Sequence, residues 1–136
     1  MVDRKKSDKL KRLVAVQRHM ERMAESDLAV TAQRLEENAQ SMNTVMEAIG
    51  SLQPLHRLFA QNYAERFDRL SNTDKQLNGL QQVQEMKLLR ERTKADRLQE
   101  NMLEARNAED REGDDEAIYD LIDLRFSTPA SSKLQK

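Results

Sequence analysis

Two histidines and one acidic run are the groups in this chain whose types could support metal or acid–base chemistry. His19 and His56 stand far apart in the sequence, and each is expected to lie on the surface of a helix. The run Asp110-Arg111-Glu112-Gly113-Asp114-Asp115-Glu116 has the composition of a calcium loop. However, placing Gly113 at the invariant glycine position of such a loop would make Ala108 the first ligand. The run is therefore not predicted to bind calcium.

The other common signatures of catalysis are missing from the sequence. There is no cysteine, so thiolate metal sites and disulfides are excluded. The chain also lacks a glycine-rich phosphate loop, a serine nucleophile motif and zinc-ligand spacing. Because catalysis needs convergent groups in an enclosed pocket, we expect no enzyme, no cofactor and no metal site.

The composition points instead to long helices. Of the 136 residues, 35% are charged and only 4% are aromatic, with no tryptophan. Ala, Leu, Met, Gln, Glu, Lys and Arg dominate, and these residues favour helices and coiled coils. A periodic apolar stripe argues against disorder, which leaves a loosely packed helical bundle as the alternative fold.

Charge and hydropathy also limit the location and the partners. The net charge of −1 gives no global reason to expect nucleic-acid binding. Near the N-terminus the longest apolar run is Leu13-Val14-Ala15-Val16, which is too short for a signal peptide or a membrane span. We therefore expect a cytoplasmic protein without membrane insertion.

Glycine and proline mark the boundaries. Gly50 and Pro54 pair a helix-ending residue with one suited to a first helical turn. We predict an all-α, elongated, antiparallel two-helix coiled-coil hairpin over residues 1–112, followed by a flexible acidic and polar tail at 113–136. Helix 1 is predicted at about 8–49 with Ser7 as N-cap, the turn at 50–54, and helix 2 at about 55–112. A break near Asn72–Gly79, which would make a three-helix bundle, is the alternative.

The apolar residues of both helices fall into rows with coiled-coil spacing. Helix 1 has one row through Leu28, Leu35, Met42 and Ile49 and a second, four residues later, through Ala32, Ala39 and Met46. Helix 2 has one row through Tyr63, Leu70, Leu77, Leu98 and Ala105 and a second through Leu88, Ala95 and Met102. Gln84 and Glu91 fall in the first row of helix 2, where they either fix the register or reach solvent at the edge.

The short turn predicts antiparallel pairing, with Leu35 near residue 69 and Leu28 near residue 76. An antiparallel pair can also form between two chains, so a homodimer stays open.

Three surfaces are candidates for binding proteins. The turn region holds Leu55, Phe59 and Tyr63, which either bind a partner or plug the end of the hairpin. The basic start, with Lys5 and Lys6, either binds a partner at the open end or is simply solvated. In the tail, an acidic segment with helical apolar spacing either docks on a partner or folds back onto that basic start. Its apolar residues are Ile118, Leu121 and Ile122.

Several segments resemble the FliJ/YscO family of type III export proteins. They are Lys9-Leu10-Lys11-Arg12-Leu13, the stretch from Met20 to Leu35, the stretch from Arg90 to Leu98, and Asp114-Asp115-Glu116-Ala117. The likeness covers most of residues 8–117, whereas the proline-containing turn and the end of the chain do not map onto the family.

This resemblance implies a small, non-catalytic, stalk-like component of a flagellar or injectisome export machine. Such a component would form an antiparallel helical hairpin and bind an export ATPase ring, an export gate or substrate chaperones. An unrelated cytoplasmic coiled-coil adaptor or holdase-type chaperone is the alternative.

Overall fold

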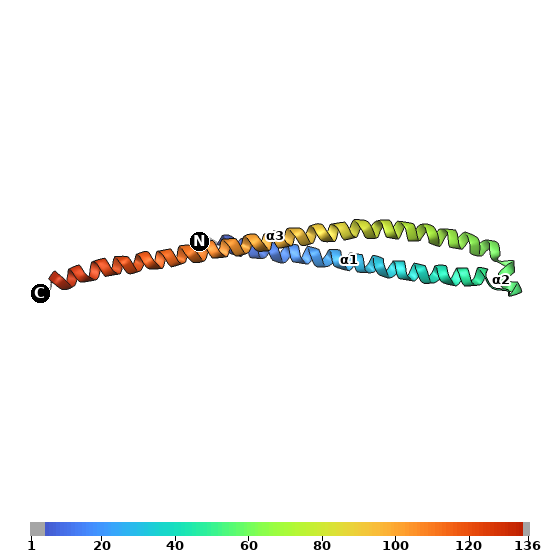
Figure 1. Ribbon diagram of the computed structural model, residues 1–136, viewed down its shortest axis with the longest axis horizontal. Coiled ribbons are helices and arrows are strands. Elements are labelled where there is room, and N and C mark those ends of the chain that lie inside the picture. Colours follow the sequence, from blue (N-terminus) through green and yellow to red (C-terminus); the bar gives the residue numbers. More distant parts are fainter. Residues whose placement is uncertain (1–4, 135–136) are drawn as a thin grey trace. The chain divides into compact units, whose positions relative to one another are not determined.

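Helices make up nearly all of the part of the chain that the structure describes. The computed structural model describes the backbone of residues 5–134 and the side chains of residues 5–127. It contains α1 (Lys6–Ile49), α2 (Pro54–Leu58) and α3 (Ala60–Leu134), and no strand within the described residues (Figure 1). The predicted all-α helical hairpin is confirmed.

The connection between the long helices contains a short helix of its own. After α1, the Gly50 amide donates to the Met46 carbonyl at 3.0 Å, which completes the last turn. Gln53 is extended (φ −66°, ψ 135°), as steric contact with the following Pro54 requires. Pro54 then begins α2, where its missing N–H costs nothing. Helix 2 of the prediction is therefore divided at Phe59 into α2 and α3.

The long helix α3 shows no break at Asn72–Gly79 and no end at Gly113. The first result agrees with the continuous helix that we predicted, whereas the second differs from the tail predicted to start at residue 113. A glycine ends a helix by adopting a positive φ, and no glycine here does so. A glycine inside a helix costs only about 1 kcal/mol relative to alanine, so Gly113 alone does not end α3. Residues 135–136 of the predicted tail lie outside the described residues.

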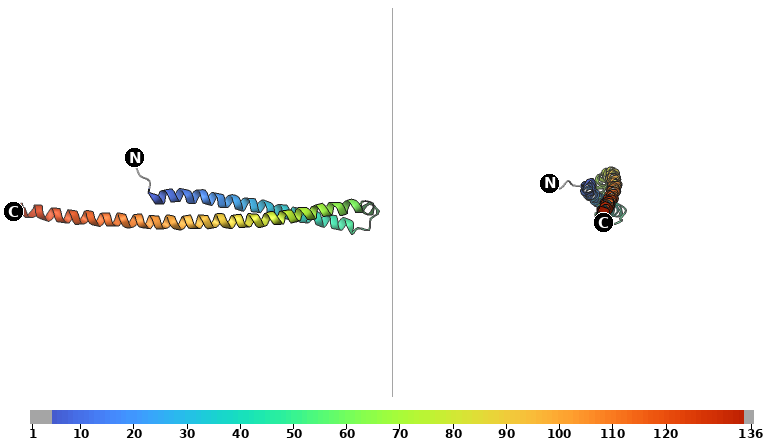
Figure 2. Two further views of the ribbon diagram at one scale, coloured as in Figure 1. Left: turned by 90° about the horizontal axis from the view of Figure 1, so that it is seen from above. Right: turned by 90° about the vertical axis from the view of Figure 1, so that its left-hand side faces the viewer.

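The chain divides into two units, which are described separately. One comprises residues 1–16 and 95–136, and the other residues 17–94. We call them the end unit and the central unit. In the central unit the Asn38 side chain bonds to the Leu70 carbonyl, and in the end unit Ser7 bonds to Glu109. The residue early in α1, Ser7, thus meets a residue late in α3, and the later Asn38 meets an earlier one, so the two helices are antiparallel within each unit (Figure 2).

The observed register differs from the predicted one by about one helical turn. Under the predicted pairing Asn38 would face residue 66, but its amide nitrogen lies 2.9 Å from the Leu70 carbonyl oxygen. The prediction treated the connection as a simple turn centred near residue 52. Because α2 occupies part of that connection, pairing resumes later on α3.

We call the interface between α1 and α3 within each unit the seam. Only one of the two predicted rows of α1 lies in it. Leu28, Leu35 and Met42 are half-buried, as expected, whereas Ile49 of the same row is exposed. The second buried row lies three residues after this row, not four, and contains Ala24, Thr31, Asn38 and Val45. The predicted row is wrong, since Ala32 and Met46 are exposed and Ala39 is only half-buried. A search for apolar residues passes over Thr31 and Asn38 because both are polar; Thr31 is satisfied by the Asp27 carbonyl of its own helix and Asn38 by the Leu70 carbonyl of α3.

Both predicted rows of α3 lie in the seam, and Ala95 is fully buried. Glu91 is only 6% exposed and Gln84 is half-buried. Glu91 therefore lies inside the seam and does not reach solvent at its edge.

Candidate functional site

A layer of polar side chains joins α1 to α3 in the central unit. Gln17 donates its side-chain amide to the Glu91 carboxylate and, at 3.2 Å, to the Glu91 backbone carbonyl. Next to it, Arg92 donates to Glu21 and to Glu25, each at 3.0 Å. Charge-assisted contacts of this kind fix one relative position of two helices, because a shift by one turn would break them.

Glu21 is a second buried carboxylate of this layer, 9% exposed beside Glu91 at 6%. Hydrogen bonds from Arg18 and then Arg92 hold the pKa of Glu21 below its ordinary value of 4.5, although burial opposes the shift. The same contacts with Glu21 and Glu25 raise the pKa of Arg92. Both groups therefore stay charged near neutral pH, and they act as structural ion pairs with no proton to exchange.

The connection exposes apolar side chains. Leu52, Leu55, Leu58 and Phe59 all stand in solvent, Leu52 and Leu58 with more than three quarters of their surface. Tyr63 is half-buried, with its ring centroid 5.9 Å from that of His56. Of the predicted residues, Tyr63 thus closes the end of the seam, whereas Leu55 and Phe59 are available to a partner.

A groove of about 580 Å³ lies beside the His56–Tyr63 pair in the central unit. Val45 and Ala48 form part of its wall, and Glu37 and Arg66 carry its charges. The groove is too open to exclude water from a reaction. His19, an exposed residue of α1, does not line it.

At the open end, Glu109 caps the start of α1. Its carboxylate accepts from the Ser7 backbone N–H at 3.0 Å and also from the Ser7 hydroxyl. Ser7 was predicted as the N-cap, but α1 begins one residue earlier and Ser7 lies in its first turn. Its N–H is one of the donors that lack a partner within the helix. The two bonds to Ser7 lower the pKa of Glu109.

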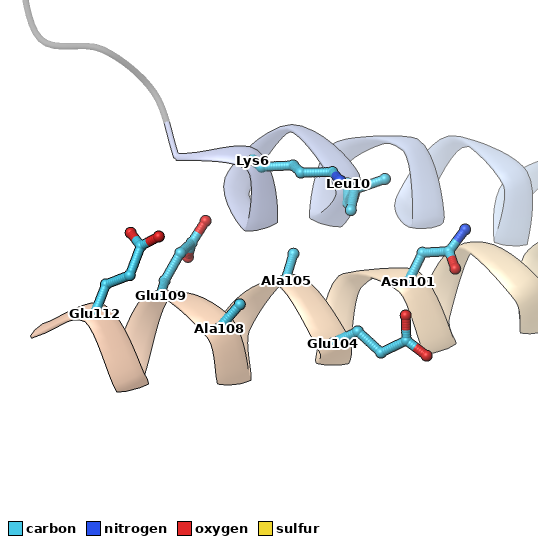
Figure 3. A pocket seen from close by; sticks show the side chains of 8 residues that line it. All are labelled: Lys6, Leu10, Asn101, Glu104, Ala105, Ala108, Glu109 and Glu112. Carbon is cyan, nitrogen blue, oxygen red and sulfur yellow. The ribbon is translucent and has the colours of Figure 1, made fainter. Parts of the chain in front are cut away.

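A second groove, of about 660 Å³, runs along the open end beside this contact. Leu10, Ala105 and Ala108 supply its apolar surface, with Lys6 and acidic residues of α3 at the margins. Figure 3 shows Ala105 and Glu109 pointing from α3 toward the first turns of α1. Lys5 and Lys6, the predicted residues of the basic start, are exposed here.

Beyond Glu109, α3 continues past the start of α1 within the end unit (Figure 2). We call residues 110–127 the overhang, and every side chain in it is exposed. The predicted residues Ile118, Leu121 and Ile122 lie in the overhang. Among the described residues, this segment does not fold back onto the basic start, an arrangement that the sequence left open.

Helical spacing in the sequence predicts that Leu13, Met20 and either Val16 or Gln17 lie in the interface with the second helix, and this prediction is wrong for Leu13, Val16 and Met20. Leu13, Val16, Met20, Met23 and Val30 are all exposed at 40% or more. The first four follow one another at intervals of three and four, Val30 comes seven residues after Met23, and each stands one residue before a buried or half-buried position of α1. In the central unit, Leu80 and Val83 of α3 are exposed as well.

The described residues were also compared with the requirements of a metal site and of a membrane span. No group of three or more His, Cys, Asp and Glu side chains among them is arranged to hold a metal ion. No helix in the described part of the chain is long and apolar enough to cross a membrane. What the geometry does offer is exposed apolar surface flanked by charge, at the connection and in the end unit.

Comparisons with protein-family models, with curated proteins and with solved structures find no match to this chain.

Proposed function

We propose that this chain is a non-catalytic, protein-binding component of a flagellar or type III protein export apparatus. In this proposal it acts in the cytoplasm and binds an export ATPase ring, an export gate or substrate chaperones. The export assignment rests on the resemblance to the FliJ/YscO family in the segments quoted above. The observation that supports protein binding is the exposure of Leu55, Leu58 and Phe59 at the connection.

Exposed side chains of this size are unusual in a chain that needs no partner. Large apolar groups gathered on a surface mark interaction sites more often than they serve the fold. Aromatic and leucine anchors contribute much of the binding energy when a partner's pocket covers them. The proposed role is mechanical and electrostatic: a rigid helical hairpin joins partners without chemistry of its own.

The test is capture of a purified export ATPase or export gate protein by the full chain. Leu55→Ala and Phe59→Ala should each lower capture while the melting temperature stays within experimental error, because neither side chain is buried. Leu89→Ala is the matched control, since Leu89 is a leucine of similar exposure on α3 of the same unit.

Equal loss of capture by Leu89→Ala would show that the connection is not the binding surface. If the wild-type chain captures neither export component, the proposal should be abandoned for a cytoplasmic coiled-coil adaptor or holdase.

A further inference from the structure

The overhang is a solitary helix with a wide apolar face. Its large apolar side chains are between 41% and 78% exposed: Ile118, Tyr119, Leu121, Ile122, Leu124 and Phe126. At 100° per residue, Glu116, Asp120 and Asp123 fall on the side opposite Ile118 and Ile122. A short isolated helix is only marginally stable in water, and helices gain most of their stability by packing such a face. The overhang therefore needs a covering surface.

The described part of the same chain does not supply that surface. α1 begins at Lys6, and its first turn is held at Glu109, before the overhang starts. All overhang side chains from residue 110 to 127 are exposed, so the described part of α1 leaves the apolar face of the overhang uncovered.

The end unit carries a second surface that is complementary to the overhang. The first turns of α1 hold the bases Lys5, Lys6, Lys9, Lys11 and Arg12 against a single acid, Asp8. The overhang holds seven acids against the two bases Arg111 and Arg125; the acids are Asp110, Glu112, Asp114, Asp115, Glu116, Asp120 and Asp123. Two overhangs would repel each other if they paired directly, whereas an overhang and the start of α1 attract.

The spacing of the two segments matches as well. On α1, Lys6 is followed by apolar residues at Leu10, Leu13 and Val16. On the overhang, Asp114 is followed at the same intervals by Ile118, Leu121 and Leu124. Leu13 and Val16 are exposed, and Leu10 lines the groove of Figure 3. A parallel alignment of the segments thus places base opposite acid and apolar residue opposite apolar residue.

We propose that the overhang of one chain docks along the start of α1 of a second copy, in a two-fold symmetric dimer. A two-fold axis perpendicular to α3 reverses the direction of α3 in the second copy. Because α1 is antiparallel to α3 in each copy, the overhang of one copy then runs parallel to α1 of the other. Each copy then gives one overhang and receives one. This inference is independent of the proposed export function.

The available area is sufficient for a stable dimer. The partly exposed apolar side chains of one overhang offer on the order of 500 Å² of surface. Two overhangs and two receiving surfaces then bury on the order of 2,000 Å², which reaches the range of specific interfaces.

The test is a charge-swap mixing experiment on the full chain by analytical ultracentrifugation. The wild type is expected to sediment as a dimer at low salt and to dissociate more readily at high salt. One variant carries Lys6→Glu and Arg12→Glu, and the other carries Asp114→Lys and Asp120→Lys, the residues that this alignment sets opposite them. Each variant alone should be monomeric, because both of its contacts oppose like charges. An equimolar mixture should form a heterodimer, in which one contact is the native one and the other is fully swapped.

These positions are exposed, so unchanged helical circular dichroism should verify that both variants fold. Leu121→Glu should weaken dimerisation by about tenfold or more, whereas Leu103→Glu, an exposed leucine of the same unit outside the overhang, should not. A monomeric wild type, or a mixture of the two variants that stays monomeric, would overturn the proposal. Dimers that persist in both variants would overturn it too, because the contact would then lie elsewhere. Such results would leave a different protein as the occupant of the overhang.

Discussion

The buried Thr31 offers a sharp test of the seam. It is only 2% exposed, and its hydroxyl donates to the Asp27 carbonyl four residues earlier at 3.2 Å. Bonds of this kind satisfy the hydroxyl within the helix, so Thr31 contributes no polar contact to the seam that the structure records. Valine has nearly the same shape and helix propensity. Thr31→Val should therefore fill the same space without a buried hydroxyl.

The expected gain in stability is about 1 kcal/mol. Valine replaces the hydroxyl by a methyl group, whose burial contributes about 0.8 kcal/mol, and it removes a bond to the i−4 carbonyl of a kind that slightly destabilises helices. Thr44→Val is the matched control: Thr44 makes the same bond, to the Gln40 carbonyl at 3.0 Å, but is exposed. Its effect should stay within about 0.5 kcal/mol of zero.

The assay is urea unfolding followed by circular dichroism, at one fixed protein concentration because dimerisation would shift the midpoint. The slope should be unchanged in both variants, so that the shift of the midpoint reports the free energy of unfolding directly. If Thr31→Val and Thr44→Val shift the midpoint equally, or if Thr31→Val is strongly destabilising, Thr31 does not lie in the seam as described.

Two further predictions address the seam and the open end. Leu28→Asp puts an unpartnered carboxylate into the seam and should cost several kcal/mol in thermal unfolding, whereas Val30→Asp, at an exposed position on the same helix, should cost little. Because Ser7 lowers the pKa of Glu109 below 4.5, the stability that Glu109 contributes is complete above that pH and is lost as pH falls through the lowered pKa. The stability difference between wild type and Glu109→Gln should therefore shrink on acidification, and a difference independent of pH would show that the Ser7 contact does not form in solution.

Local chemistry determined much of the fold without any knowledge of tertiary contacts. The scarcity of glycine and proline, the strong helix formers and the spacing of Leu28, Leu35 and Met42 are sufficient to predict two long antiparallel helices. The rows of α3 were predictable too, because Leu70, Leu77 and Leu98 keep one phase over many turns. The same local chemistry identified Leu55, Phe59 and Ile118 as apolar groups with no obvious place in a two-helix seam.

The partner row on α1 and the register depended on the tertiary structure. An apolar repeat permits a second row either three or four residues later, and only contact with α3 selects Thr31 and Asn38 over Ala32 and Ala39. Similarly, the register depends on how many residues the connection uses, and the short helix α2 cannot be read from Gly50 and Pro54 alone.

Gly113 shows the same division between local and tertiary effects. Its sequence context suggested a stop, but glycine ends a helix only where the following chain gains by turning away. Here nothing in the described structure draws the following residues away from the helix axis, so α3 continues into the overhang. Local propensity determined that the helices exist, whereas the contacts between them, such as Ser7 with Glu109 and Asn38 with Leu70, decided which faces meet. The physical reason is that a helix presents the same periodicity on every face, and only a partner surface distinguishes one face from another.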